Sequence, residues 1–600
     1  MDTQPVIVKQ ERIDDVPLLL GMMRQMKIAE IIDKQLPRHH LHEGLSNGNL
    51  ALGWIAHILS QSDHRKSAVQ DWALGLDRTL QAFYGQTLRP IEFSDDRLGI
   101  VADYLAAADW DTLEGALFHS CFAVYDLPNN VFRVDATATC GYHTSEPDGI
   151  MQLGHSKDHR PDLPQLKIMA AVTQPLGFPV ATAVVPGNQA DDVLYWPTIV
   201  QVKEKVGGKE LLFVGDCKMA SLDNRARIAN AGDYYLTPLP NTGETAKQLP
   251  SWIDTAIQKE ANAQLQTIYR PTDAEDPDPL QPEMIGQGYE FERTLQTRID
   301  EKDVTWLERV QIVQATSQVD CQKKKLREEL QNAEEKLGRL TLSGKGRKIW
   351  RDEQELRRAI GAIEEEYGVE GFLEVKLTQE TVEKKKYGKP GRPGEQAVAE
   401  VTRDVRYRIH DVQRNEEAIA AKENRLGWRA FVSNAPVKRL NLEESVLTYR
   451  EGGGLERPFH QLKDAPLGIR PLFVRLDEQI VGLTRLVLIA LRVQMLIEIV
   501  LRGRMGETGE KLEGLYEGQK SKLEGKPTGK RVLRAIAGLE MTVSLIQVGV
   551  RQWWFLPALP RLLVRVLELL GLPASLYTNL TNAVHCSIAS STPSRPILSG

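Results

Sequence analysis

The chain has 600 residues, which is too long for a single hydrophobic core and predicts several domains. Hydrophobic residues make up 42% of it and charged residues 26%, an ordinary globular composition that excludes wholesale disorder. The net charge of −6 excludes a uniformly basic DNA-coating protein, although a DNA enzyme needs only local basic patches.

Residues 1–128 are predicted to form a helical N-terminal domain. Apolar side chains such as Leu20, Met23 and Ile28 recur at helical spacing. Further apolar stretches surround Trp54 and Ile100, and polar residues of the type that begins helices separate them.

Residues 129–244 change to a strand-rich pattern. A strand from Val131 is predicted to end at Asp135, and a short buried strand ends at Gly215-Asp216. Helices are predicted after Asp191 and over Ser221–Ala231. The remaining strand candidates are 166–172, 180–185 and 234–236. Three strands followed by alternation with helices favour a mixed sheet of five strands with helices on both faces.

Residues 245–427 are predicted to form a largely helical insertion. Segments 323–340 and 349–367 are rich in Glu, Lys, Arg and Leu, and they predict two long charged helices that form a hairpin. Residues 428–505 return to the core through a strand near Phe431 and a long apolar helix. That helix carries Arg485 and Arg492 at what would be mid-bilayer, which favours a buried core helix over a membrane span. Residues 506–600 are predicted to be helical, with a frayed tail.

Two acidic residues stand at the ends of predicted core strands. They are Asp135 in FRVDATAT and Asp216 in LLFVGDCKM. Carboxylates at strand ends point into a shared crevice, and without His or Cys ligands they suit Mg²⁺ or Mn²⁺. A pair of such ions supports phosphoryl transfer. By spacing alone, the two residues fit strand-terminating turns equally well.

Glu456 is the candidate third carboxylate. In LERPFHQLK, Phe459 and Lys463 follow it at +3 and +7 and therefore share one helix face. Glu456 at one end of this face is placed to bind a metal, and Lys463 two turns later is placed to reach a DNA phosphate. Taken alone, the motif also fits a simple amphipathic helix.

These segments together resemble the DDE transposases of bacterial insertion sequences, in the group with a Tyr-x-x-Arg-x-x-x-Glu-x(6)-Lys signature. The resemblance rests on FRVDATATCGYH, GHSKDHRPDLPQLK, VVPGNQADD, VGDCKMAS and LERPFHQLK, in this order. The leader segments ALGWIAHILSQSDHRKS and FSDDRLG extend it over most of the chain.

The resemblance implies a multidomain α/β protein with an RNase H-like core. Asp135, Asp216 and Glu456 match the three catalytic carboxylates, which would bind two Mg²⁺ ions, with Mn²⁺ as a substitute. The long separation of Asp216 from Glu456 implies an insertion domain. The implied reaction is metal-assisted cleavage at the element's ends, followed by attack of the 3′-hydroxyls on target DNA.

The signature is imperfect in this sequence. Tyr449, Glu456 and Lys463 match it, but Gly452 stands at the Arg position, where Arg450 or Arg457 is the candidate replacement. Three consecutive glycines and Pro458 predict that the helix begins near Glu456, with Tyr449 in a preceding loop. Glu451 is an alternative third carboxylate. The resemblance also makes Lys157, Arg160 and Lys167 candidate DNA contacts, although solvated turn charges explain them equally well.

The expected partners are the terminal inverted-repeat DNA, target DNA and a second copy of the chain, with no membrane. Five cysteines without a C-x-x-C pair favour a reducing cytoplasm, where the protein would associate with the nucleoid. Two alternatives stay open. One is an impaired relic that binds DNA ends without cutting them, and the other is a coiled-coil scaffold, favoured only by the charged helices.

Overall fold

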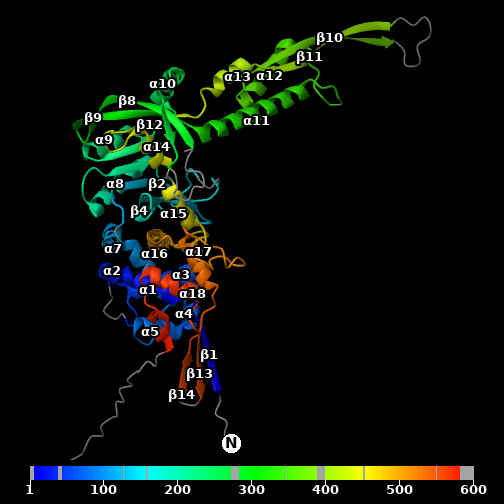
Figure 1. The fold of residues 1–600 in the computed structure, drawn as a ribbon. Helices are drawn as coiled ribbons and strands as arrows, with labels where there is room; N and C mark the ends of the chain where they lie inside the picture. Colours follow the sequence, from blue (N-terminus) through cyan, green and yellow to red (C-terminus); the bar gives the residue numbers. More distant parts are fainter. Residues whose placement is uncertain are drawn as a thin grey trace, which may run out of the picture. The chain divides into compact units, whose positions relative to one another are not determined.

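The structure is a computed structural model that describes residues 6–37, 43–125, 127–156, 160–271, 283–344, 346–387, 399–450, 453–548 and 551–581 (Figure 1). The chain divides into two compact units. Unit 1 comprises residues 1–236, 297–304 and 448–600. Unit 2 comprises residues 237–296 and 305–447.

Helices form the first part of unit 1, in agreement with the sequence analysis. The apolar residues of these helices are largely buried, and in the third helix every residue from Leu50 to Leu59 is buried. Ser46 caps that helix by accepting a hydrogen bond from the backbone N–H of Asn49 at 3.2 Å. The helices are α1 (Val16–Gln25), α2 (Ile28–Gln35), α3 (Asn47–Gln61), α4 (Lys66–Leu74), α5 (Asp77–Tyr84), α6 (Asp95–Ala107) and α7 (Trp110–Tyr125).

A mixed sheet follows in unit 1, with the strand order β4-β3-β2-β5-β6. Strand β3 is buried along its whole length, as expected for a central strand covered on both faces. Helix α8 packs against β3 and β4. The elements are β2 (Val131–Cys140), β3 (Gln165–Thr173), β4 (Pro179–Pro186), α8 (Asp192–Val206), β5 (Leu212–Gly215), α9 (Leu222–Asn230) and β6 (Tyr234–Pro238). The predicted strands and helices of this region are all present.

The first core strand is longer than predicted. It does not end at Asp135, because β2 stays paired with the antiparallel strand β3 as far as Cys140, opposite Gln165. The sequence analysis placed the end of this strand at Asp135. At this point only the parallel pairing with β5 ends, with Val134 as its last residue.

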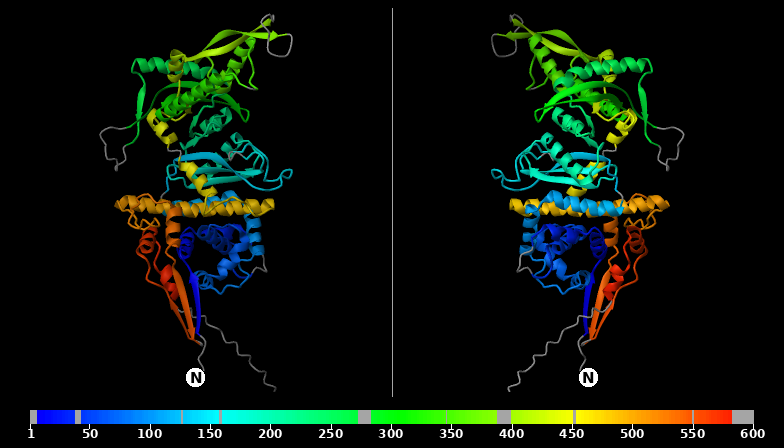
Figure 2. Two further views of the ribbon diagram at one scale, coloured as in Figure 1. Left: turned by 90° about the vertical axis from the view of Figure 1, so that its right-hand side faces the viewer. Right: turned by 90° about the vertical axis from the view of Figure 1, so that its left-hand side faces the viewer.

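Helices α15 (Gly453–Lys463) and α16 (Asp477–Thr508) complete the core of unit 1. Figure 2 shows the long helix α16 lying beside N-terminal helices, and it contacts α3 and α6. In the described chain, α16 alone is long and apolar enough to cross a membrane, but 89% of its most apolar window is buried inside the structure. Arg492 is fully buried and forms an ion pair with the buried Glu114 of α7. The prediction of a buried helix here agrees with this placement.

The end of unit 1 is only partly helical, which corrects the prediction of a helical C-terminal region. Strand β13 (Thr542–Val548) pairs with β14 (Arg551–Phe555) and with β1 (Val6–Arg12), so the two ends of the described chain share one antiparallel sheet. Sequence periodicity did not reveal this sheet, because its strands are short and β1 lies more than 500 residues before β13 and β14. The helices here are α17 (Gly529–Ala537), α18 (Arg561–Leu570), α19 (Ser575–Thr578) and the 3₁₀ turn η1 (Asn579–Thr581).

Unit 2 contains strands that the predicted, largely helical insertion did not include. The last residues of β6, Thr237 and Pro238, belong to this unit. After β6, the order of hydrogen-bonded neighbouring strands is β12, β9, β8 and β7. These strands lie outside the five-stranded core that the sequence analysis predicted. The elements of this sheet and its neighbours are α10 (Gly243–Ala261), β7 (Gln266–Tyr269), β8 (Met284–Ile299), β9 (Lys302–Ala315), β12 (Trp428–Ser433) and α14 (Leu442–Arg450).

The rest of unit 2 combines helices with a long β-ribbon. Helices α11 (Thr316–Leu340) and α12 (Glu353–Tyr367) pack together, as predicted. Strands β10 (Leu373–Tyr387) and β11 (Ala399–Arg414) form an antiparallel ribbon, which α11 contacts (Figure 1). Helix α13 (Glu416–Glu423) follows. One side of α11 is buried, because Leu326, Leu330 and Leu337 recur at helical spacing and are all buried.

Candidate active site in unit 1

The shared register of two strands places Asp135 beside Asp216. Strands β2 and β5 run parallel, and their pairing ends with Val134 opposite Gly215. Asp135 is the next residue of β2, and Asp216 directly follows the end of β5. Because side chains alternate between the faces of a sheet and neighbouring strands lie about 4.8 Å apart, the two carboxylates lie on one face, close to each other.

The Asp216 carboxylate is held by two donors. Its Oδ1 accepts hydrogen bonds from the Tyr195 hydroxyl at 2.6 Å and from the Lys218 backbone N–H at 2.8 Å. In Asp135, Oδ1 accepts from the Ala136 backbone N–H at 2.7 Å. Both aspartates are half-buried, which leaves them accessible to a ligand.

Tyr195 is a site residue that the sequence analysis missed. It projects from α8 and is 1% exposed. Burial, and then the negative charges of Asp135 and Asp216, raise its pKa well above the ordinary value, so the hydroxyl stays protonated and donates to Asp216. The sequence predicted a helix beginning near Asp191, but it gave no signal that this side chain faces the carboxylates.

The last residues of α14 are fixed to the strand that carries Asp135. Arg133 Nη2 donates to the backbone oxygen of Tyr449 at 2.7 Å and to that of Thr448 at 3.2 Å. The Arg133 guanidinium also lies 5.3 Å from the centre of the Tyr449 ring. Arg133 and Asp135 share one face of β2, since they are two residues apart. Tyr449 thus lies in a helix rather than in the predicted loop, and its backbone is bound on the carboxylate face of β2.

Glu456 lies in the first turn of α15, which packs against β2 and β3. The helix begins at Gly453, three residues before the predicted start. The Glu456 side chain is exposed, and Lys463, two turns further along the helix, is half-buried. The alternative carboxylate Glu451 and the signature position Gly452 lie outside the described residues.

Arg457 anchors α15 to α16. It forms an ion pair with Glu498 of α16, which is 1% exposed and also binds Arg502 at 2.9 Å. Glu498 further accepts from the Gly529 backbone N–H at 3.1 Å. Burial, and then the nearby Arg502, lower the pKa of Arg457 to about 10. Because its guanidinium is paired with the buried Glu498, Arg457 is a poor candidate for direct DNA contact, whereas Arg450 is exposed.

The other predicted DNA contacts have different environments. Lys167 is 7% exposed, and its ammonium donates to Asp191 at 2.7 Å and to the Gln189 backbone oxygen. This buried, hydrogen-bonded side chain is therefore a poor candidate for DNA contact. Arg160 is exposed and forms an ion pair with Asp162 at 2.7 Å. Lys157 lies outside the described residues.

The donor chemistry of the two aspartates fits a hard divalent cation such as Mg²⁺, which prefers carboxylate oxygens. In the part of the chain that the structure describes, however, no three His, Cys, Asp or Glu side chains gather closely enough to hold a metal ion. The structure therefore brings Asp135 and Asp216 together, and it places Glu456 on a helix that packs against the same strand without adding it to the pair.

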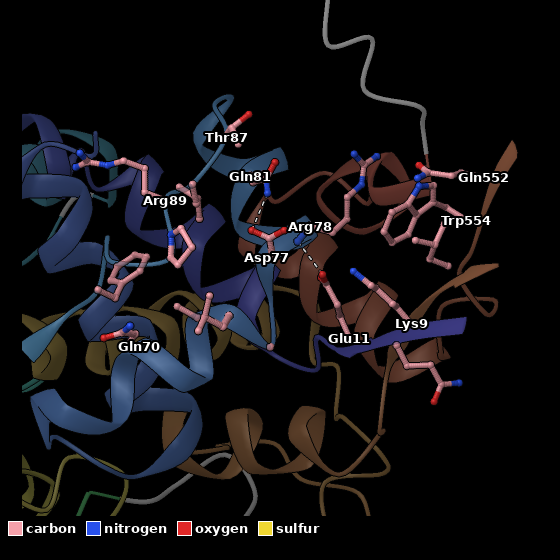
Figure 3. A pocket seen from close by; sticks show the side chains of 18 residues that line it. Lys9, Glu11, Gln70, Asp77, Arg78, Gln81, Thr87, Arg89, Gln552 and Trp554 are labelled. Carbon is pink, nitrogen blue, oxygen red and sulfur yellow. Dashed lines mark hydrogen bonds between the residues drawn. The ribbon is translucent and has the colours of Figure 1, made fainter. Parts of the chain in front are cut away.

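A separate cavity of about 830 Å³ lies elsewhere in unit 1 (Figure 3). Side chains from β1, α5 and β14 line it, among them Lys9, Arg78 and Trp554. Glu11 accepts a hydrogen bond from the Arg78 backbone N–H at 2.7 Å, and the Arg78 guanidinium lies 4.8 Å from the centre of the Trp554 ring. The lining carries charges of both signs, so its chemistry points to no particular ligand.

Comparisons with known proteins place the carboxylates in a recognised domain. Residues 128–492, more than half of the chain, match the family model described as "Transposase DDE domain". Residues 8–118 match a "Domain of unknown function (DUF4277)". No curated protein matches the chain.

Among solved structures, the chain is similar to a piggyBac transposase in a synaptic complex with hairpin DNA. The identity is 10% and the TM-score 0.32, over 93% of this chain and 85% of that chain. This TM-score is too low to support an argument about the fold.

Proposed function

The chain belongs to the family of DDE transposases, and from this premise we propose that it cuts DNA at the ends of an insertion sequence and joins those ends to target DNA. One observation carries the proposal. Asp135 and Asp216 each directly follow the last pair of the parallel β2–β5 register, Val134 opposite Gly215, inside the matched region. Paired carboxylates of this kind are suited to metal-dependent phosphoryl transfer.

In this proposal the sheet of unit 1 is an RNase H-like core, and Asp135, Asp216 and Glu456 hold two Mg²⁺ ions, which Mn²⁺ can replace. When bound, the ions would activate the attacking oxygen and stabilise the leaving oxygen. Tyr195 orients the Asp216 carboxylate through its hydroxyl. The link from Arg133 to Tyr449 holds the segment before α15 on the face of β2 that carries Asp135.

The proposed partners are the element's inverted-repeat DNA, target DNA and a second copy of the chain in the end complex, within the bacterial cytoplasm. Arg160, Arg450 and Lys463 are proposed as phosphate contacts in unit 1, because their side chains are exposed or half-buried.

A second candidate is a DNA-end-binding protein that no longer cuts. Glu456 is exposed, and the described residues contain no group of three carboxylates that could hold a metal ion, which favours this second candidate. The two candidates differ in one measurable respect, since both bind DNA ends but only the first cleaves them in a metal-dependent way.

The test is cleavage of labelled DNA taken from the flanks of the gene, with Mg²⁺ and with EDTA. The full-length native chain is compared with Asp135→Asn, Asp216→Asn and Glu456→Gln. Glu517→Gln, which removes an exposed carboxylate between α16 and α17, is the matched control. We expect each site variant to cut about 100-fold more slowly or worse, because a lost ligand removes several kcal/mol of transition-state stabilisation.

End binding should survive in all variants, because DNA docking uses other groups. Retained cleavage in a site variant would remove that residue from the proposed set. A native chain that binds the ends and never cuts them, with either metal, would support the second candidate.

A further inference from the structure

A small basic pocket lies in unit 2, where the loop between α11 and α12 meets strand β11. Its volume is about 230 Å³. The charged side chains that line it are all cationic, namely Arg347, Lys348, Arg406 and Arg408. Trp350 and Tyr407 supply aromatic walls, and Ser343 and Gly344 contribute to the rim.

The loop is fastened to the ribbon on both sides of the pocket. The Tyr407 backbone N–H donates to the Trp350 backbone oxygen at 2.9 Å, and the Ile409 backbone N–H donates to Thr341 Oγ1 at 3.1 Å. Arg408 Nη2 donates to Ser343 Oγ at 2.9 Å. The loop and the Arg408 guanidinium are therefore held in place before any ligand arrives, which lowers the entropic cost of binding.

Carboxylates only partly neutralise these cations. Lys348 pairs with Glu355 at 2.6 Å, and Arg408 pairs with Glu380 at 3.1 Å. Arg406 shares Asp404 with two further cations outside the pocket lining, Arg351 at 2.7 Å and Lys384 at 3.4 Å. Hydrogen bonds from Arg351, and then from Arg406, hold the pKa of Asp404 well below its ordinary value, so this carboxylate stays ionised.

Six basic groups thus share three carboxylates among these described residues, in a chain whose net charge is −6. Arg347 and Lys348 at the loop tip are both exposed, and the Lys348 ammonium lies 4.1 Å from the centre of the Trp350 ring. A fixed, net positive pocket with several guanidinium groups matches the charge and geometry of a phosphate group.

We propose that this pocket binds a backbone phosphate of duplex DNA, as a second DNA contact separate from the carboxylate site. The inference rests on the proposed function, because a transposase must hold DNA over more than the cleaved bond. DNA is favoured over a small phosphate ligand because exposed basic residues continue along the ribbon at Lys376, Lys384 and Lys386. Cations at several positions along one strand fit a polymer of phosphates.

The test measures binding of the full-length chain to a 30-base-pair duplex of arbitrary sequence as salt is raised. Arg347→Gln/Lys348→Gln removes the two exposed cations. The matched control is Lys324→Gln/Lys325→Gln on α11, which removes two exposed lysines whose only ion pairs in the described chain are with Glu328 and Glu329. A charge-preserving variant, Arg347→Lys/Lys348→Arg, tests whether charge alone is needed.

We expect the pocket variant to bind more weakly and to reduce the slope of log affinity against log salt by about 0.9 for each lost phosphate contact. The control should keep the native slope, and the charge-preserving variant should keep most of it. Melting temperatures equal to the native value will show that these surface changes leave the fold intact.

Two outcomes would overturn the inference, and they differ in what they imply. If the pocket variant and the control give the same slope while the native chain still cleaves DNA with Mg²⁺, the pocket is not a DNA contact and the proposed function stands. If the native chain neither binds nor cleaves DNA, the pocket inference and the proposed function both fail.

Discussion

The Tyr195 hydroxyl shows how a single buried donor shapes the candidate site. It is 1% exposed and donates to Asp216 Oδ1 at 2.6 Å, next to a backbone donor from Lys218. A carboxylate with two fixed donors cannot rotate freely, so its remaining lone pairs point in a set direction. Groups of this kind, one step away from a metal ligand, tune metal affinity without touching the substrate.

Tyr195→Phe should therefore keep the fold and weaken the site. We expect a loss of about 10- to 100-fold in metal affinity or cleavage rate, with a higher Mg²⁺ concentration needed for half-maximal cleavage. The matched control is Tyr577→Phe, which also deletes a buried hydroxyl, here one that donates to the Asp14 backbone oxygen at 2.8 Å. A Mg²⁺ requirement unchanged in Tyr195→Phe would assign Tyr195 to packing alone.

At the level of elements, α16 organises unit 1 through close backbone approach. A Cβ added to Gly482 would lie 1.9 Å from the Ala102 backbone oxygen of α6, so only glycine permits this contact. Arg485 then donates to the last carbonyls of α6, at 2.7 Å to Leu105 and 2.8 Å to Ala106. Gly482 allows α16 and α6 to approach closely, and Arg485 donates to backbone carbonyls at the end of α6 that have no partner within that helix.

Gly482→Ala should push α6 and α16 apart and lower the free energy of unfolding by about 1–3 kcal/mol or more, because the clash is with backbone. Gly503→Ala on the same helix is the control, since nothing lies within 4 Å of the added Cβ. That change should be neutral or stabilising by up to about 1 kcal/mol through helix propensity. Calorimetry of both variants measures their melting temperatures. Equal melting temperatures would refute the argument that Gly482 is required for the close contact between α6 and α16.

On the scale of the whole molecule, the helices and ribbon of unit 2 have a hydrophobic core of their own. Its buried members run from Leu326 to Ile419 and include Leu330, Leu356 and Ile360. The apolar side chains packed against them also lie between residues 340 and 426. A core built from one continuous stretch does not need the rest of the chain to bury its apolar surface.

A fragment of residues 316–427 should consequently fold by itself, with a helical circular-dichroism spectrum and a cooperative thermal transition. Leu330→Ala should lower its free energy of unfolding by about 2–5 kcal/mol, because Leu330 is 1% exposed at the centre of this core. The exposed change Lys324→Gln is the control. A fragment without a cooperative transition would show that this core depends on the remaining chain.

The sequence by itself determined the features that depend on local pattern. The strands and helices between residues 129 and 238, the helices before residue 125 and the pair α11–α12 follow from periodicity and turn residues, which act over a few neighbours. Asp135 and Asp216 were identified in the same way, because each follows a short apolar run. The family match over residues 128–492 confirms the DDE assignment at this level.

Only the tertiary structure decided how distant segments meet. The register of β2 on β5, the direction of Tyr195, the burial of Lys167 and the pairing of Arg457 with Glu498 each join residues that local pattern cannot relate. The same holds for the sheet of β1, β13 and β14, and for the strands of unit 2. These contacts are fixed by packing and hydrogen bonding across the fold, where non-local burial overrides local preference.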